Sequence, residues 1–399
     1  MLLALHERCQ LVALAAGIRR LRTRTPACWG QGTGRDRTSP HSRRRTARTV
    51  ACLCLATVAA TVALQAQRAP SALPGRLLIL PRPAGRYPVG CIRARLPAAP
   101  GGRGPGLLVQ VHYPAELEGE LPNIPAMKYC RPEVSKAIAE GYNLPRALLR
   151  IVLEGRKQVD PSCRPALCEA GKWPMVLFSS GLWGCLEFYT QLGRELASAG
   201  AIAVALEHED GTGVVAVDRS TGEAIEYIEQ PEWPYDLITF NRPFLERREV
   251  ELRESVAAIV AAATQSADEV DIAEAALLQV LGGADPEQLI LAGHSFGAAG
   301  LLHSLCQAPE AWRKSCCGAL LLDAWPGPLT TDVSGAALEE LGAQLPVPYV
   351  VLLSEFWAQN EYYGASCRRL ATAPSPHCLG GAIVPGTSHY WVSDTQWWG

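Results

Sequence analysis

The residues best suited to chemistry lie between Gln288 and Gly300. The apolar run Gln288–Ala292 leads into Gly293–Gly297, which reads Gly-His-Ser-Phe-Gly, and then into small residues that favour a helix. A strand, a Gly-x-Ser-x-Gly turn and a helix form a nucleophile elbow, where both glycines must lack side chains because strand and helix nearly touch. The pattern predicts Ser295 as a nucleophile.

A serine hydroxyl needs a base to take its proton and an acid to orient that base. Asp323 and His389 each follow an apolar run downstream of Ser295. The order Ser, Asp, His is that of the α/β-hydrolases, and it predicts these three residues as the catalytic set. Glu355, which follows another apolar run, is the rival for the acid.

Acyl transfer also needs donors for the oxyanion of the tetrahedral intermediate. One donor is predicted to be the backbone N–H of Phe296, directly after the nucleophile. The other should come from the glycine-containing loop that follows an early strand, within Phe178–Gly184. Leu182 is the predicted donor in that loop.

The elements that must position these residues are short apolar runs that alternate with helix-like segments from about residue 75 to 399. Continuous apolar runs are typical of strands covered on both faces, so the expected fold is α/β, with a mostly parallel central sheet and helices on both faces. The expected strands are Leu107–His112, Met175–Phe178, Ile202–Leu206, Gln288–Ala292, Ala319–Leu322, Tyr349–Leu353 and Gly381–Val384, and the expected helices include Glu187–Ser198, Arg247–Thr264 and Gly297–Cys306. Ala137–Glu154 is an amphipathic insertion: a cap, a membrane-contacting face or a helix packed on the sheet.

Composition narrows the class of protein. The chain has 399 residues, 48% apolar and 19% charged, with a net charge of −2. Residues 1–48 carry eleven Arg against two acidic residues, so the remainder is acidic, which argues against nucleic-acid binding. Neither Cys-x-x-Cys nor His-Glu-x-x-His occurs, so no metal or cofactor is expected.

Residues 1–68 are predicted to be a targeting segment. Residues 1–48 are Arg-rich and acid-poor, as in plastid-type transit segments, and 49–67 form an apolar, uncharged stretch. This stretch is either a cleaved signal or a single membrane anchor, because about 20 apolar residues span a bilayer. The hydrolase domain, 75–399, is therefore expected in an organelle, membrane-anchored or secreted, rather than in the cytoplasm.

The motifs together resemble one known family, the platelet-activating factor acetylhydrolases of the secreted and type II intracellular group. The resemblance rests on Tyr87–Cys91, Val111–Pro114, Phe178–Gly184, Leu206–Asp210, Gly293–Gly297, Leu322–Trp325 and Gly386–His389. The Asp-Ala-Trp sequence of residues 323–325 favours Asp323 over Glu355. The resemblance implies Ser295, Asp323 and His389 as nucleophile, acid and base, with Leu182 and Phe296 at the oxyanion. Ser180 stands where the family usually has a histidine.

The resemblance also implies a substrate, the sn-2 acyl ester of platelet-activating factor and of phospholipids with short or oxidised chains, hydrolysed without a metal. Trp183, Trp325 and Trp391 lie beside the catalytic positions and are expected to contact this phospholipid or a membrane surface. Two alternatives stay open: a general carboxylesterase or acyltransferase of the same fold, and a catalytically silent lipid-binding protein. The sequence makes no prediction of oligomeric state.

Overall fold

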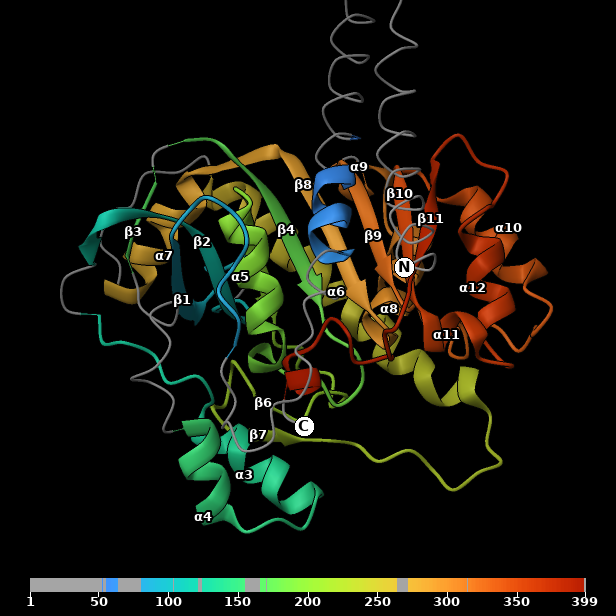
Figure 1. Cartoon of the computed structure of the whole chain (residues 1–399), viewed down its shortest axis with the longest axis horizontal. Coiled ribbons are helices and arrows are strands. Elements are labelled where there is room, and N and C mark those ends of the chain that lie inside the picture. Colours follow the sequence, from blue (N-terminus) through green and yellow to red (C-terminus); the bar gives the residue numbers. More distant parts are fainter. Residues whose placement is uncertain are drawn as a thin grey trace, which may run out of the picture.

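The computed structural model describes residues 52, 55–63, 80–102, 104–120, 124–154, 166–169, 171–263, 272–313 and 315–397. In this part of the chain a nine-stranded sheet runs in the order β1-β2-β5-β4-β8-β9-β10-β11, with β3 paired to β2 (Figure 1). The strands are β1 Val89–Arg95, β2 Leu108–Glu120, β3 Ala166–Cys168, β4 Trp173–Ser179, β5 Ile202–Leu206, β8 Ala284–His294, β9 Gly318–Leu322, β10 Tyr349–Ser354 and β11 Cys378–Val384; β6 Val215–Val217 and β7 Ala224–Glu226 form a separate hairpin.

The strand directions define the fold class. β2 is antiparallel to its three partners β1, β3 and β5, whereas every neighbouring pair from β5 to β11 is parallel. Helices connect the parallel strands and cover both faces of the sheet (Figure 1). This is the mostly parallel sheet of an α/β-hydrolase, and the predicted fold class is confirmed.

The helices follow the expected segments, some with different bounds. They are α3 Pro132–Gly141, α4 Arg146–Leu149, the π-helical η1 Arg150–Glu154, the 3-10 helix η4 Leu186–Tyr189, α5 Thr190–Ser198, α6 Leu237–Ala262, α7 Ile272–Gly282, α8 Phe296–Gln307, α9 Glu310–Arg313, α10 Ala336–Gln344, α11 Glu355–Gln359, α12 Gly364–Leu370 and the 3-10 helix η5 Asp394–Trp397. α6 begins ten residues before the predicted Arg247. Asp236 caps it, accepting hydrogen bonds from the N–H groups of Ile238 and Thr239.

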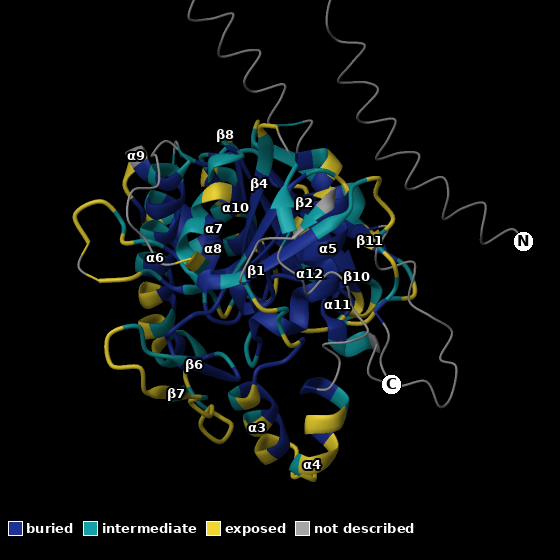
Figure 2. Ribbon diagram, turned by 90° about the vertical axis from the view of Figure 1, so that its left-hand side faces the viewer, coloured by how far each residue is buried: buried dark blue, intermediate teal, exposed yellow. Residues whose placement is uncertain are grey.

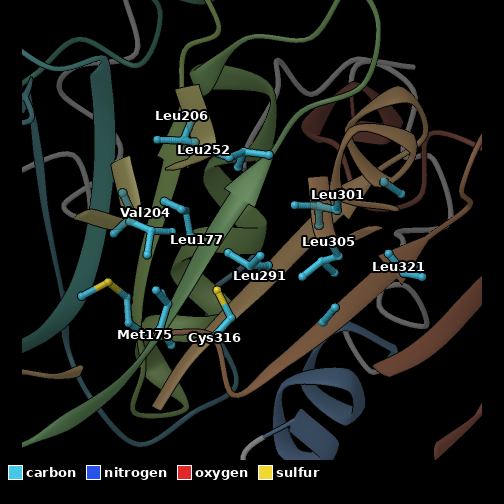
Figure 3. Close-up of a cluster of buried hydrophobic side chains, with 14 of the residues drawn as sticks. Met175, Leu177, Val204, Leu206, Leu252, Leu291, Leu301, Leu305, Cys316 and Leu321 are labelled. Atoms are coloured by element: carbon cyan, nitrogen blue, oxygen red, sulfur yellow. The ribbon is translucent and has the colours of Figure 1, made fainter. Parts of the chain in front are cut away.

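Two apolar clusters hold the sheet between its helices. Leu177 and Leu291 lie in one cluster with residues of α6, α7, α8, α10 and α12 (Figure 3). Val176 and Ile290, their neighbours in sequence, lie in the other cluster with residues of α5. Because successive side chains of a strand point to opposite faces, a strand between two clusters must be apolar at every position.

The second cluster also contains part of the predicted targeting segment. Residues 55–63 are helical, and Leu55, Val58 and Val62 are buried in that cluster. A Cβ added to Gly318 of β9 would lie 3.0 Å from a methyl of Leu55, so this helix lies directly on the sheet. Residues 1–51, 53, 54 and 64–79, including the rest of the apolar stretch, lie outside the described residues. Among the described residues, no helix has both the length and the apolarity needed to cross a membrane.

The amphipathic insertion forms α3, α4 and η1. These elements project from the body beyond the edge at which the parallel strands end (Figure 1), and α4 carries much exposed surface (Figure 2). Leu153 is buried there, whereas Leu148 and Ile151 are 50% and 70% exposed. The insertion therefore packs one apolar side inward and leaves another uncovered.

Candidate active site

The predicted elbow is present at the junction of β8 and α8. Ser295 stands between the two elements with φ 54° and ψ −117°, a positive-φ conformation that is strained for a residue with a side chain. A Cβ on Gly293 would lie 2.7 Å from the backbone of Gly297, and one on Gly297 would lie 2.1 Å from the carbonyl oxygen of Ser179. Both positions therefore require glycine.

The structure brings Ser295, His389 and Asp323 together from three separate loops. Nε2 of His389 lies 3.0 Å from Oγ of Ser295, and its Nδ1 lies 3.2 Å from Oδ2 of Asp323. Because a carboxylate only accepts, Nδ1 carries the proton and Nε2 accepts from the serine hydroxyl. The geometry matches that of a nucleophile, a base and an orienting acid.

Asp323 is fully buried and is held by several donors. Its Oδ1 accepts the N–H of Ser354 at 2.6 Å, and its Oδ2 accepts the Ser354 hydroxyl at 2.6 Å and the indole N–H of Trp391 at 3.1 Å. Donors aimed at a buried carboxylate stabilise its charged form and fix its orientation. The rival Glu355 does not contact the imidazole; its Oε2 accepts the N–H of Gly386 at 2.7 Å.

The imidazole of His389 is packed from one side by an indole. The ring of Trp357 stacks on it with centroids 3.9 Å apart and an interplanar angle of 15°. Trp357 is fixed in turn, because its Nε1 donates to the carbonyl of Ala324 at 3.0 Å and its backbone N–H donates to Oγ of Ser354 at 3.1 Å. This stack restricts rotation of the imidazole away from Oγ of Ser295.

The predicted oxyanion residues lie on the two sides of the elbow. Phe296 follows Ser295 at the start of α8, and Leu182 lies in the loop after β4. Among the described residues neither N–H has a hydrogen-bond partner. The loop is fixed beside Leu182, where Trp183 has φ 56° and donates its N–H to the carbonyl of Thr212 at 2.7 Å.

A hydrogen-bonded chain connects that loop to the base. The N–H of Gly181 donates to the hydroxyl of Tyr189 at 3.2 Å, which lies 3.0 Å from Nδ1 of His294, while Nε2 of His294 lies 2.8 Å from the carbonyl of His389. Burial and the neighbouring His389 hold the pKa of His294 well below its usual range, so its ring is neutral. Because a carbonyl only accepts, Nε2 carries the proton and Nδ1 accepts from Tyr189.

In the described part of the chain, one set of side chains has the spacing of a metal site. Ligand atoms of His294, Asp323 and His389 lie within 4.8 Å of one another. These groups are the ones already joined by the hydrogen bonds above, and the histidine nitrogens all have partners. The hydrogen bonds thus account for all four nitrogens of the two imidazoles.

Comparison with known protein families shows to which family the chain belongs. The model of the family "Platelet-activating factor acetylhydrolase, isoform II" matches residues 76–361, a range that includes Ser295 and Asp323 and ends before His389. The chain belongs to this family. The resemblance found in the sequence is thereby confirmed.

Two relatives of this acetylhydrolase family member show the extent of the similarity. It is 24% identical over 286 residues to the platelet-activating factor acetylhydrolase of Cavia porcellus, covering 70% of this chain and 61% of that protein. It is 28% identical over 195 residues to that of Bos taurus, covering 46% of this chain and 40% of that protein. The matches thus span less than two thirds of these relatives.

Solved structures of similar shape include a ferulic acid esterase from Streptomyces cinnamoneus. It aligns with a TM-score of 0.49 and 18% identity, covering 79% of this chain and 78% of that one. A putative dienelactone hydrolase from Klebsiella pneumoniae aligns with a TM-score of 0.38 and 12% identity, covering 75% and 86%.

The three predicted substrate-contacting tryptophans of this family member differ in their surroundings. Trp183 is half-buried, and its ring lies 4.9 Å from that of Tyr142 at the end of α3. Trp325 is buried against the ring of Phe296, with centroids 6.1 Å apart. Trp391 is only 1% exposed and donates to Asp323, so it holds the acid rather than lining a surface open to substrate.

Sequence reasoning missed Ser354, Trp357 and Tyr189. Ser354 ends β10 and meets Asp323 because β9 and β10 are parallel neighbours. The sequence signal that could have indicated Ser354 is its position at the end of an apolar run, directly before the rival Glu355. Tyr189 lies in η4, and no motif marks it.

Proposed function

We propose that the chain is a carboxylic ester hydrolase in which Ser295 is the nucleophile, His389 the general base and Asp323 the acid that orients it. The observation that carries this proposal is the continuous hydrogen-bonded line from the serine hydroxyl through the imidazole to the buried carboxylate, with distances of 3.0 and 3.2 Å. Family membership supports the same activity.

The reaction follows from this arrangement. Oγ of Ser295 attacks the ester carbonyl carbon while Nε2 of His389 takes its proton, and the carbonyl oxygen becomes an oxyanion beside the N–H groups of Leu182 and Phe296. The imidazolium then protonates the leaving alcohol, and an acyl-serine remains. Water, deprotonated by the same imidazole, attacks the acyl carbon; the acid departs and Ser295 regains its proton.

The proposed substrate is a phospholipid with a short or oxidised acyl chain at sn-2, of which platelet-activating factor is one example. Family membership and the activity for which the relatives are named support this class. The insertion supplies a surface suited to lipid, since Leu148 and Ile151 are exposed and Ile151 lines a hollow with Lys128 and Arg150. Glu154 also lies there and pairs with Lys128 and Arg146, so the surface keeps a net positive charge. Apolar side chains next to cationic ones favour a phospholipid interface.

A lipid panel tests the proposal. Purified wild type and the Ser295→Ala variant are incubated with phosphatidylcholines that carry acetyl, glutaryl or palmitoyl groups at sn-2, and with p-nitrophenyl acetate. We expect wild type to release the sn-2 acid from the first two lipids far faster than from the third, and the variant to be inactive.

Turnover of p-nitrophenyl acetate without lipid hydrolysis would indicate a general carboxylesterase, and acyl transfer to added lysolipid would indicate an acyltransferase. Inactivity on every ester would indicate a silent lipid-binding protein.

Contact with a membrane surface is tested separately. We expect the double variant Leu148→Ser/Ile151→Ser to bind phosphatidylserine vesicles more weakly in a flotation assay, while hydrolysis of soluble p-nitrophenyl acetate stays unchanged. Val333, 60% exposed in the turn before α10, provides the control, Val333→Ser. Equal vesicle binding by the double variant and the control would contradict contact through the insertion.

A further inference from the structure

Arg248, on α6, is a charged side chain sealed inside the protein behind the candidate active site. Its exposed fraction is 0%. A cation in such a place is tolerated only when its donors are paired, because an unpaired buried charge costs several kcal/mol. Its partners therefore show what this side chain organises.

The guanidinium uses all three of its nitrogens. Nε donates to Oδ2 of Asp210 at 2.8 Å, and Nη2 donates to Oγ1 of Thr212 at 2.6 Å. Nη1 donates to the carbonyl of Ser180 at 2.5 Å and to Oγ of Ser179 at 3.2 Å. This fixed planar fork is a property of arginine that a lysine ammonium does not share.

These contacts hold the backbone on both sides of Leu182. The carbonyl of Ser180 belongs to the loop two residues before it. Thr212, which accepts a hydrogen bond from Nη2, uses its own carbonyl to accept the N–H of Trp183, directly after Leu182, at 2.7 Å. The loop that carries the first oxyanion donor is thus attached to one guanidinium by two routes.

The same guanidinium touches the residue of the second donor. Its central carbon lies 4.8 Å from the centroid of the Phe296 ring, which is fully buried. A guanidinium over an aromatic face at this distance is attracted to it. Arg248 therefore contacts the structural supports of both predicted oxyanion N–H groups.

Glu251, a second charged side chain on α6, strengthens the attachment of the Leu182 loop to this helix. Ser179 also hydrogen bonds to Nε2 of His208 at 2.8 Å, and Nδ1 of His208 lies 2.8 Å from Oε2 of Glu251, one turn after Arg248. This Ser-His-Glu series has the connectivity of a catalytic triad. Ser179 is fully buried and already accepts from Arg248, so the series supports the loop and does not meet substrate.

We infer that Arg248 is a positioning residue that sets the separation of the Leu182 and Phe296 N–H groups, and thereby the capacity of the site to stabilise the oxyanion. This inference rests on the proposed function. Arg248 touches no reacting atom. Its effect is confined to the transition state, since both donors bind the oxygen most strongly when it is charged.

The test compares Arg248→Lys with Arg253→Lys, a control on the same helix whose partly exposed guanidinium pairs with Glu249. Active sites are counted by fluorophosphonate labelling, and kcat and KM are measured per labelled site with p-nitrophenyl acetate. Inhibition by phenylboronic acid is also measured, because its tetrahedral serine adduct places an oxygen in the oxyanion site. Deleting one oxyanion donor lowers kcat about 100- to 1,000-fold, so displacing donors should lower it about 10- to 100-fold.

For Arg248→Lys we expect that fall in kcat, a KM within about threefold of wild type, and an inhibition constant that rises in parallel with the fall in kcat. Arg253→Lys should match wild type. If Arg248→Lys does not fold, Thr212→Val, which removes one acceptor, should lower kcat about threefold to tenfold with the same parallel rise. A kcat per labelled site equal to wild type, or an unchanged inhibition constant, overturns the inference. Failure of the proposed function is distinct, because wild type itself would then neither label nor hydrolyse.

Discussion

Removing the hydroxyl of Ser354 tests how the buried acid is held. The Ser354→Ala change deletes the 2.6 Å hydrogen bond to Oδ2 of Asp323 and the bond that Oγ accepts from the N–H of Trp357 at the start of α11. A hydrogen bond to a charged group contributes about 2 kcal/mol, and a helix N-cap about 1 kcal/mol. We therefore expect the free energy of unfolding to fall by about 3 kcal/mol.

The activity should fall as well. Asp323 keeps the N–H groups of Ser354 and Trp391 but loses its shortest side-chain donor, and Trp357, which stacks on His389, loses one of its two hydrogen bonds. A loss of about 1.4 kcal/mol in transition-state stabilisation corresponds to about a tenfold lower kcat. KM should stay unchanged, because Ser354 itself is fully buried and acts only through Asp323 and Trp357.

Ser366 provides the matched control. It is equally buried, but its hydroxyl donates to a neutral acceptor, the carbonyl of Asp332, at 3.3 Å. We expect Ser366→Ala to lose about 1 kcal/mol and no activity. Urea unfolding gives the stabilities, and steady-state hydrolysis of p-nitrophenyl acetate gives kcat. Equal losses of stability and activity in the two variants would refute the reasoning.

Three further changes test other parts of the molecule. Tyr189→Phe removes the hydroxyl between Gly181 and His294, so kcat should fall about tenfold in a steady-state assay while KM stays constant. Burial, together with two nearby arginines, lowers the pKa of His112 to about 3, so this side chain stays neutral in the native state but is protonated near pH 6.5 in the unfolded state. The free energy of unfolding should therefore fall as the pH drops below 6.5, by about 2 kcal/mol at pH 5, as measured by urea unfolding. The His112→Asn variant should lack this part of the pH dependence. A chain that starts at residue 70 lacks the buried helix at 55–63, whereas one that starts at residue 50 retains it. The shorter chain should have a free energy of unfolding about 5 kcal/mol lower and should bind more hydrophobic dye, because the apolar surface under the helix becomes exposed.

Sequence patterns predicted the elements that are apolar throughout. Each expected strand of the parallel sheet is present. The strands inside the sheet are buried on both faces, which leaves a continuous apolar run such as Ala319–Leu322. β1 was not among them, since Arg93 and Arg95 interrupt its apolar residues; both arginines bind partners that only the tertiary structure brings near, Gln110 and Glu209.

The candidate site likewise contains residues that the sequence predicts and residues that it does not. Ser295, Asp323 and His389 were predictable because each follows a strand in an order typical of this fold, and sheet topology then brings strand ends together. The donors to Asp323 were not, because nothing in the sequence specifies which way a side chain near the site points. Trp391 illustrates this: its position after His389 predicted substrate contact, yet its indole N–H points to the acid.

The central claim is that Ser295 is the nucleophile, and covalent labelling measures this most directly. Wild type is treated with a fluorophosphonate, and intact mass followed by peptide mapping locates the adduct, alongside the Ser295→Ala variant. We predict one adduct per chain, on Ser295, together with loss of ester hydrolysis at the rate of labelling, and no adduct on the variant. Labelling of another residue, or hydrolysis retained by Ser295→Ala, would contradict the claim.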